Sequence, residues 1–147
     1  MLNPDFTDIL SAFIAEKVEF LVVGGYAMAF HGYVRATGDI DLWIRLSDEN
    51  AEKVWRALQT FGAPLFDLQI EDLKTPGMVF QIGLVPSRID IITQIDGVEF
   101  DAAWKEHKTV QIEDLSVPVI GKTHLLINKQ STGRAKDRND ALWLQDE

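Results

Sequence analysis

The sequence contains no cysteine among its 147 residues. Disulfide bonds, thiolate zinc sites and cysteine nucleophiles are therefore excluded. It also has no apolar run near the roughly 20 residues that a membrane-spanning helix needs. Acidic residues, Asp5 and Asp8, stand near its start, where a secretion signal has lysine or arginine. We therefore expect a cytoplasmic protein that does not associate with membranes.

Basic residues are scarce: 14 Lys and Arg stand against 23 Asp and Glu, a formal net charge of -9. A surface of that sign repels nucleic acid and anionic membranes, so general nucleic-acid binding is disfavoured. Residues 122–138 are the exception, because basic side chains outnumber the single acid, Asp137. The basic residues of this segment are Lys122, Lys129, Arg134, Lys136 and Arg138. We expect a phosphate-sized anion to be bound there, if anywhere.

The composition is typical of a folded protein, with 46% hydrophobic and 25% charged residues and only ten Gly and five Pro. No repeat or linker divides the chain, so we expect a single domain over residues 1–147. Apolar periodicity predicts helices over 4–16, 26–31, 47–60, 122–130 and 135–144, with helical turns at 70–73 and 100–105. It predicts strands over 19–23, 39–45, 65–68, 78–82, 89–95, 109–112 and 115–120. The expected fold class is α+β: a small mixed sheet flanked by helices, with a peripheral hairpin and two C-terminal helices.

Asp39 and Asp41 alternate with the apolar Ile40 in a predicted strand. Side chains on a strand repeat every two residues, so both carboxylates leave the sheet on one face. Two like charges so close are costly in a partly buried site unless a cation lies between them. Magnesium, a hard cation bound by a few carboxylate oxygens, is the natural candidate.

Asp90 is a third acid in an otherwise apolar strand, and it can join the same face from a neighbouring strand. Three carboxylates around two metal ions are the arrangement that in-line phosphoryl or nucleotidyl transfer uses. The alternative is that Asp39 and Asp41 are exposed edge-strand acids and that Asp90 pairs with Arg88 or Arg35.

Gly24 and Gly25 lie between a predicted strand and a predicted helix. Paired glycines at such a junction let backbone N–H groups approach a phosphate. The alternative is an ordinary tight turn from strand to helix. The combination with Asp39-Ile40-Asp41 on the next strand is more specific than either motif alone.

With these motifs the chain resembles the nucleotidyltransferase superfamily that includes DNA polymerase beta, and especially its small prokaryotic members, the minimal nucleotidyltransferases. Val22-Val23-Gly24-Gly25 resembles the family's apolar-strand and Gly-Gly or Gly-Ser motif. Asp39-Ile40-Asp41 resembles its metal motif, and Arg35-Ala36-Thr37-Gly38 resembles the approach to that motif. The resemblance covers about 19–95, with a weaker match over 129–140.

The resemblance implies a palm-like fold in which Asp39 and Asp41 hold two magnesium ions. Asp90 would complete the site and help to deprotonate the acceptor. The triphosphate of a nucleoside triphosphate would lie on Gly24 and Gly25. Further nucleotide-binding candidates are Arg35, Thr37, Lys129 and Lys136. Arg35 can instead neutralise the acids, and the lysines can instead belong to a solvated helical face with Asp137 and Asp140 as partners.

The expected function is magnesium-dependent transfer of a nucleoside monophosphate to a hydroxyl of a protein, a small molecule or an RNA end. The family context adds a place in a toxin–antitoxin module with a partner protein. No added domain for a polynucleotide is present, which disfavours a template-copying enzyme. The alternative is an inactive binding or regulatory protein with the same fold, because Gly25 stands where many active relatives have serine.

Overall fold

The computed structural model describes residues 2–33 and 37–146. The helices are α1 (Pro4–Ala15), α2 (Gly24–Phe30), α3 (Asp48–Phe61), the 3-10 helix η1 (Ile70–Lys74), α4 (Phe100–Lys105), α5 (Lys122–Ser131) and α6 (Ala135–Asp146). The strands are β1 (Phe20–Val23), β2 (Ile40–Ile44), β3 (Val79–Ile82), β4 (Ile89–Ile92), β5 (Lys108–Ile112) and β6 (Leu115–Val119). Helices and strands are mixed along the chain, as an α+β fold requires.

The strands form one six-stranded mixed sheet in the order β3-β4-β2-β1-β6-β5. Strand β2 is central: it pairs in parallel with β4 and antiparallel with β1. Strand β1 pairs in parallel with β6, and the antiparallel strands β3 and β5 form the two edges. The β5–β6 hairpin therefore continues the sheet at one edge and does not lie apart from it.

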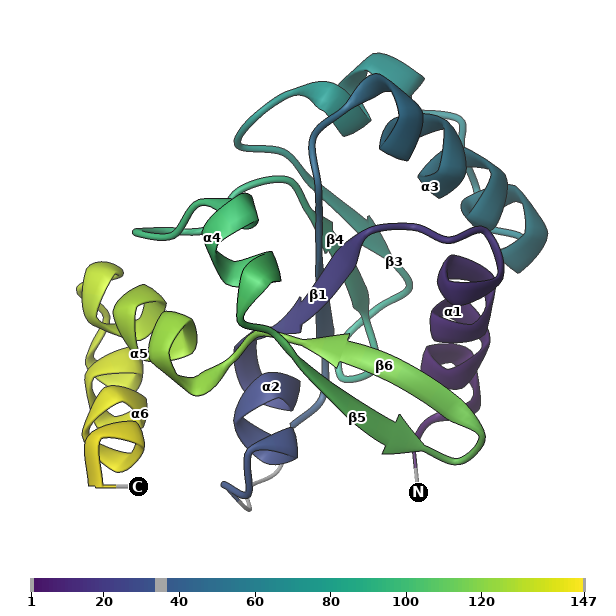
Figure 1. The fold of residues 1–147 in the computed structure, drawn as a ribbon. Coiled ribbons are helices and arrows are strands. Elements are labelled where there is room, and N and C mark those ends of the chain that lie inside the picture. The colour runs from purple at the N-terminus through teal and green to yellow at the C-terminus, as the bar shows by residue number, and fades with distance from the viewer. Residues whose placement is uncertain (1, 34–36, 147) are drawn as a thin grey trace.

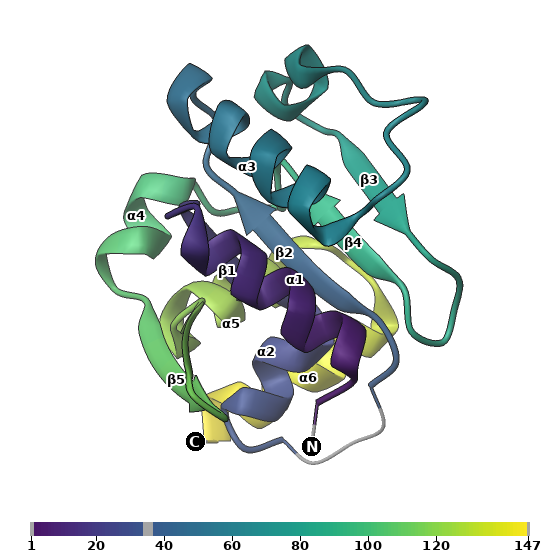
Figure 2. The same cartoon turned by 90° about the vertical axis from the view of Figure 1, so that its right-hand side faces the viewer.

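Helices cover both faces of the sheet. Helices α1 and α3 lie on one face, and α4, α5 and α6 lie on the other (Figure 1). In the rotated view α1 crosses in front of β1 and β2, while α5 and α6 lie behind them (Figure 2). Ile40, Leu42 and Ile44 of β2 are completely buried. These three even-numbered residues share one face of the sheet. Because side chains alternate along a strand, Asp41 and Trp43 lie on the opposite face.

Local signals explain where the long helices begin and end. The Asn3 side chain caps α1 by accepting a hydrogen bond from the Asp5 N–H at 2.7 Å. The Ser47 hydroxyl caps α3 by accepting from the Asn50 N–H at 3.0 Å. Helix α3 ends at Gly62, whose φ of 91° is left-handed and therefore favours glycine. The predicted helices 4–16 and 47–60 are confirmed to within one residue at each end.

Three sequence predictions differ from the structure. The strand predicted over 89–95 ends three residues earlier, at Ile92. Residues 65–68 form a turn and not a strand, because Gly62 and Pro64 break the chain just before it. Helix α2 begins at Gly24 and not at Tyr26, so both glycines belong to its first turn. The helical turn predicted at 70–73 is confirmed by η1. Among the described residues, no helix has the length and apolar character to cross a membrane.

Candidate active site

Asp41 and Asp90 lie side by side on the parallel strands β2 and β4. They are direct partners in the register of the two strands, so their side chains leave the same face of the sheet. Trp43, two residues along β2, marks this face as the one toward α4, because its ring packs edge-on against Phe100 of that helix. The prediction that Asp90 joins Asp41 from a neighbouring strand is therefore confirmed.

Arg88 links Asp39 to Asp90. Its guanidinium donates to both oxygens of Asp90, from Nε at 2.7 Å and from Nη2 at 3.1 Å. The same Nη2 lies 3.4 Å from Oδ2 of Asp39, and the Arg88 backbone N–H donates to Oδ1 of Asp39 at 2.9 Å. The pairing of Asp90 with Arg88, left open by the sequence, is thus present, and it occurs inside the acid cluster. Asp39, Asp41 and Asp90 form one cluster with Arg88 as its counter-ion.

Asp41 is the acid that Arg88 neutralises least. Burial, followed by the charge and a hydrogen bond of Asp90 and then the charge of Asp39, raises the pKa of Asp41 to about 7. The positive charge of Lys129 opposes this shift without cancelling it. Burial and the neighbouring carboxylates therefore disfavour the ionised form of Asp41, and the cluster holds more carboxylates than its one arginine balances.

Gly24 lies against Asp41. A Cβ at Gly24 would stand 2.2 Å from Oδ2 of Asp41, and the glycine has a φ of +68°, which disfavours other residues. Strand β1 brings this contact about, because Val23 is the register partner of Asp41. The first glycine of the pair thus makes room for the central carboxylate, while Gly25 lines the adjoining cavity.

A cavity of about 530 Å³ opens over the acid cluster. Two basic side chains, Arg134 and Lys136 of the α5–α6 region, also line it. Its lining is completed by these residues: Gly25, Thr37, Gly38, Asp39, Asp41, Val85, Pro86, Arg88 and Asp90. The structure thus brings together acids that suit a cation, bases that suit an anion, and a glycine at the start of a helix. This cavity is called the acid-cluster cavity below.

Lys129 does not line the acid-cluster cavity. Lys129 is 5% exposed, and its Nζ lies 3.0 Å from Oδ1 of Asp137 and 3.1 Å from Oδ2 of Asp140. Asp137 and Asp140 are the partners expected for Lys129 if it does not bind phosphate. All three side chains are buried, however, and do not form the solvated helical face that was expected. Lys129 therefore acts on Asp41 through its charge. Arg35 lies outside the described residues.

Two features of the site were not recognised from the sequence. The bridging role of Arg88 was detectable, because Arg88 and Asp90 are two residues apart and therefore share a face of the strand. The contact between Gly38 and the turn before β4 was not detectable from the sequence. A Cβ at Gly38 would stand 2.3 Å from the carbonyl oxygen of Pro86. That close approach brings Pro86 to the rim of the cavity.

The donor chemistry of the cluster fits a hard divalent cation. Three carboxylates carry up to three negative charges against one positive charge on Arg88, and oxygen ligands are what magnesium prefers. Arg88 is already a stand-in cation for Asp39 and Asp90. Within residues 2–33 and 37–146, no set of three or more histidine, aspartate or glutamate side chains is arranged as a ready-made metal site. A metal ion therefore fits only if Arg88 releases carboxylate oxygens to it.

Solved structures of the same fold include nucleotidyltransferases. A protein of Thermotoga maritima classed as a nucleotidyltransferase has a TM-score of 0.61 at 17% identity, over 100% of this chain and 97% of that one. A lincosamide antibiotic adenylyltransferase with bound lincomycin has a TM-score of 0.60 at 17% identity, over 99% and 97%. An antigenic nucleotidyltransferase-like protein of Paracoccidioides brasiliensis has a TM-score of 0.55 at 13% identity, over 95% and 74%. No family model matches the sequence, and no curated protein is significantly similar to it.

Proposed function

We propose that this chain, which has the nucleotidyltransferase fold, transfers a nucleoside monophosphate from a nucleoside triphosphate to an acceptor hydroxyl. The observation that carries the proposal is the register pairing of Asp41 with Asp90 beneath a cavity that also holds Arg134 and Lys136. Acids for the reacting centre and bases for a polyphosphate thus share one cavity. The fold that the chain shares with an adenylyltransferase supports the same activity.

The donor triphosphate would be bound on the basic side of the acid-cluster cavity. Gly25 lines this cavity in the first turn of α2, where the backbone N–H groups have no partner within the helix and are available to a phosphate. The Arg134 side chain is 73% exposed, although its Nε donates to Asp137, and Lys136 is exposed as well. Both side chains can therefore turn to a phosphate without loss of packing. Thr37 lines the same cavity and is a further phosphate-binding candidate.

In the proposed reaction the acceptor hydroxyl oxygen forms a bond to the α-phosphorus. The bond from that phosphorus to the bridging oxygen of the leaving group breaks, and pyrophosphate departs. Asp90 accepts the hydroxyl proton, because the pairing of β4 with β2 places its carboxylate beside Asp41. Most of the rate enhancement comes from positioning and from neutralisation of the phosphate charge.

Asp39, Asp41 and Asp90 are the residues that would hold magnesium, with two ions expected from the family resemblance. Magnesium, when bound, supplies positive charge to the phosphate oxygens and to the attacking oxygen. Burial, together with the neighbouring charges of Asp90 and Asp39, raises the pKa of Asp41, and a bound cation would relieve both effects. Arg88 would then turn from the carboxylates toward the substrate.

The proposal also covers the acceptor and the cellular setting of the reaction. The proposed acceptors, in a cytoplasmic setting, are a partner protein within a toxin–antitoxin module, a small molecule and an RNA end. The relative that carries lincomycin supports a small molecule. The competing function is an inactive binding or regulatory protein, for which the glycine at position 25 is the supporting feature.

Metal-dependent nucleotide binding separates the two functions. Isothermal titration calorimetry with ATP, in magnesium and in EDTA, should give binding that needs magnesium and that is lost in Asp39→Asn/Asp41→Asn. A matched control is Asp67→Asn, a residue of the turn after α3 that lies outside the acid-cluster cavity. ATP binding that is the same in EDTA, or that survives in the double variant, would contradict the proposed site.

A further inference from the structure

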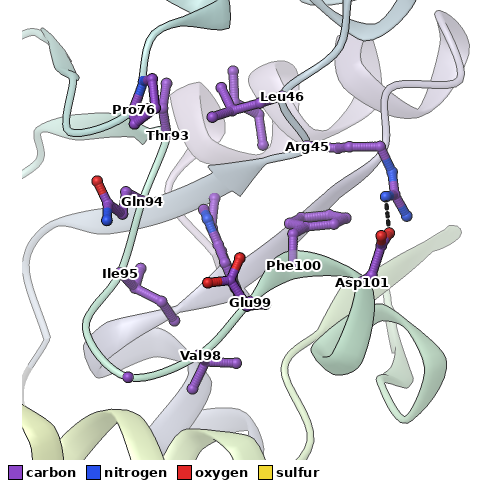
Figure 3. A pocket seen from close by; sticks show the side chains of 13 residues that line it. Arg45, Leu46, Pro76, Thr93, Gln94, Ile95, Val98, Glu99, Phe100 and Asp101 are labelled. Atoms are coloured by element: carbon purple, nitrogen blue, oxygen red, sulfur yellow. Dashed lines mark hydrogen bonds and ion pairs between the residues drawn. The ribbon is translucent and has the colours of Figure 1, made fainter.

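A second cavity lies on the same face of the sheet as the acid cluster. Its volume is about 450 Å³. It is lined by the end of β2 with the two residues that follow (43–46), by Pro76, and by eight residues of the segment 93–101 (Figure 3). Trp43 pairs with Ile92 in the same register in which Asp41 pairs with Asp90. Two residues along a strand are about 7 Å apart and point to the same side. The second cavity therefore begins about one residue pair beyond the acids.

The acid pair lies between the two cavities. The acid-cluster cavity takes residues from before β2 and from the turn before β4, whereas the second cavity takes residues from after the middle of both strands. An in-line transfer needs the attacking and leaving oxygens on opposite sides of the phosphorus. Two cavities at the two ends of β2 and β4, with Asp41 and Asp90 between them, have this arrangement.

Apolar and aromatic side chains form much of the wall of the second cavity. Trp43 is 2% exposed, and its ring lies 5.0 Å from that of Phe100, which is half-buried. Leu46, Ile95 and Val98 surround the opening beside Phe100 (Figure 3). Walls of this kind bind the apolar part of a small molecule, and a few polar groups orient it.

The charges in the second cavity select against anions. Its one basic side chain, Arg45, donates to Glu19 at 2.5 Å and to Asp101, so its charge is already matched. The Glu99 side chain points toward the middle of the cavity (Figure 3), and its carboxylate makes no hydrogen bond or ion pair with any described residue. The exposed amide of Gln94 is beside it. The cavity thus holds one carboxylate without a partner and no spare positive charge.

We propose that the second cavity is the acceptor site and that it takes a small hydroxylated molecule bearing an ammonium group. The ammonium group binds Glu99, the apolar part packs on Phe100 and Trp43, and a hydroxyl extends along β2 and β4 to Asp90. This inference rests on the proposed function and narrows it, because a phosphate-rich acceptor such as an RNA end is repelled here. The triphosphate stays in the acid-cluster cavity, where Arg134 and Lys136 lie.

Three probes of matched shape test the charge preference. They are 2-amino-1-phenylethanol (cationic), 1-phenyl-1,2-ethanediol (neutral) and mandelate (anionic), each with the same phenyl group and benzylic hydroxyl. NMR titration of the labelled full-length chain should show the cation binding most tightly and mandelate least, with shifts at Trp43 and Gln94. Glu99→Gln should weaken the cation about tenfold, as expected for loss of a charged hydrogen-bond partner, and leave the neutral diol unchanged.

Controls separate this inference from the proposed function. Glu52→Gln removes an equal charge from α3, on the opposite face of the sheet, and should leave all three affinities unchanged. Absence of shifts at Trp43 and Gln94, equal binding of mandelate, or no effect of Glu99→Gln would overturn the assignment of the second cavity. Binding of ATP with magnesium is measured in the same samples without probes. If ATP does not bind but the cationic probe does, the proposed nucleotidyltransferase activity is refuted and the assignment of the second cavity is not. ATP binding with no charge preference refutes only the cavity.

Discussion

Gly24 gives Asp41 its place: a Cβ on this glycine would stand 2.2 Å from Oδ2 of the aspartate. The Gly-Gly motif and the acid motif are thus parts of one contact, made where β1 and β2 pair. The two glycines therefore have different structural roles. Gly24 admits the carboxylate, and Gly25 lines the cavity where a phosphate is proposed to bind.

Replacement of Gly24 by alanine should separate activity from stability. The φ of +68° makes alanine cost about 1–2 kcal/mol of folding free energy, and the new Cβ displaces the Asp41 carboxylate. Gly62→Ala is the matched control, since its φ is +91° and nothing lies within 4 Å of the Cβ it would gain. Urea unfolding should give similar losses for both variants, while nucleotide transfer falls at least tenfold only for Gly24→Ala. Equal activity of the two variants contradicts the contact.

Asp41→Asn should stabilise the metal-free protein above neutral pH. The folded-state pKa of Asp41, about 7, lies above its usual value of 3.8, so the folded state holds a proton that the unfolded state releases between these values. Wild-type stability therefore falls as the pH rises from about 4 to 7, and the asparagine variant escapes this loss. Its gain should be small at pH 4 and roughly 3–4 kcal/mol at pH 8, measured by urea unfolding in EDTA. A constant difference across this range would refute the shift.

Arg88→Ala should make stability depend on magnesium. Without the guanidinium, Asp39 and Asp90 lose their counter-ion, which should lower the melting temperature in EDTA. The same loss frees carboxylate oxygens for a cation, so 10 mM magnesium, roughly a saturating amount, should raise the melting temperature of the variant more than that of the wild type. Calorimetry in the two buffers checks this, with Arg56→Ala, an exposed arginine of α3, as control. Equal magnesium shifts in all three proteins would show that Arg88 and a cation do not compete.

Lys129 and Lys136 should behave differently although they lie seven residues apart. Lys129→Met leaves Asp137 and Asp140 buried without their lysine, at a cost of about 3–5 kcal/mol. Lys136 is exposed, so Lys136→Met should change stability by less than about 0.5 kcal/mol. ATP affinity, by contrast, should fall for Lys136→Met because this side chain lines the acid-cluster cavity. Urea unfolding and calorimetry on both variants test the contrast, which fails if the two lysines weaken ATP binding and folding alike.

Acidification should weaken the contact between α5 and α6, because it protonates Asp137, which pairs with Lys129. Burial alone would raise the pKa of Asp137, but hydrogen bonds from Thr132 and Lys129 outweigh it and hold that pKa below the usual range. A lowered carboxyl pKa stabilises the fold above the unfolded-state value, and this stabilisation is lost as the pH falls through the folded-state value. Asp137→Asn should therefore unfold more readily than the wild type at pH 7, and the difference should shrink toward pH 2. Circular dichroism during acid titration measures this.

The parts of the site that follow from local rules could be predicted. Strand alternation placed Asp39 and Asp41 on one face, and an acid inside an apolar strand pointed to Asp90. Helix periodicity and capping residues predicted most helix bounds, because both signals lie within a few neighbouring residues. Residues 65–68 show the limit, since an apolar stretch without a pairing partner forms a turn.

The rest depends on contacts between distant segments. The sequence shows that Lys129 is basic, but only the packing of α5 on α6 reveals that Asp137 and Asp140 surround its ammonium group. The second cavity likewise joins residues 43–46 to 93–101. No periodicity within either segment indicates that they meet, because their proximity comes from the parallel pairing of β2 with β4.

Transfer of label from α-³²P-ATP is the most direct test of the account. Purified protein, magnesium and an acceptor mixture of small amino alcohols and cell lysate are incubated, and labelled products are separated by size. The account predicts magnesium-dependent labelling of a small molecule by the wild type, with release of unlabelled pyrophosphate, and at least a hundredfold less labelling by Asp41→Asn, since loss of one charge-stabilising group costs roughly 10²–10³ in rate. Equal labelling by the wild type and Asp41→Asn, or none by the wild type while it binds ATP and magnesium, would contradict it.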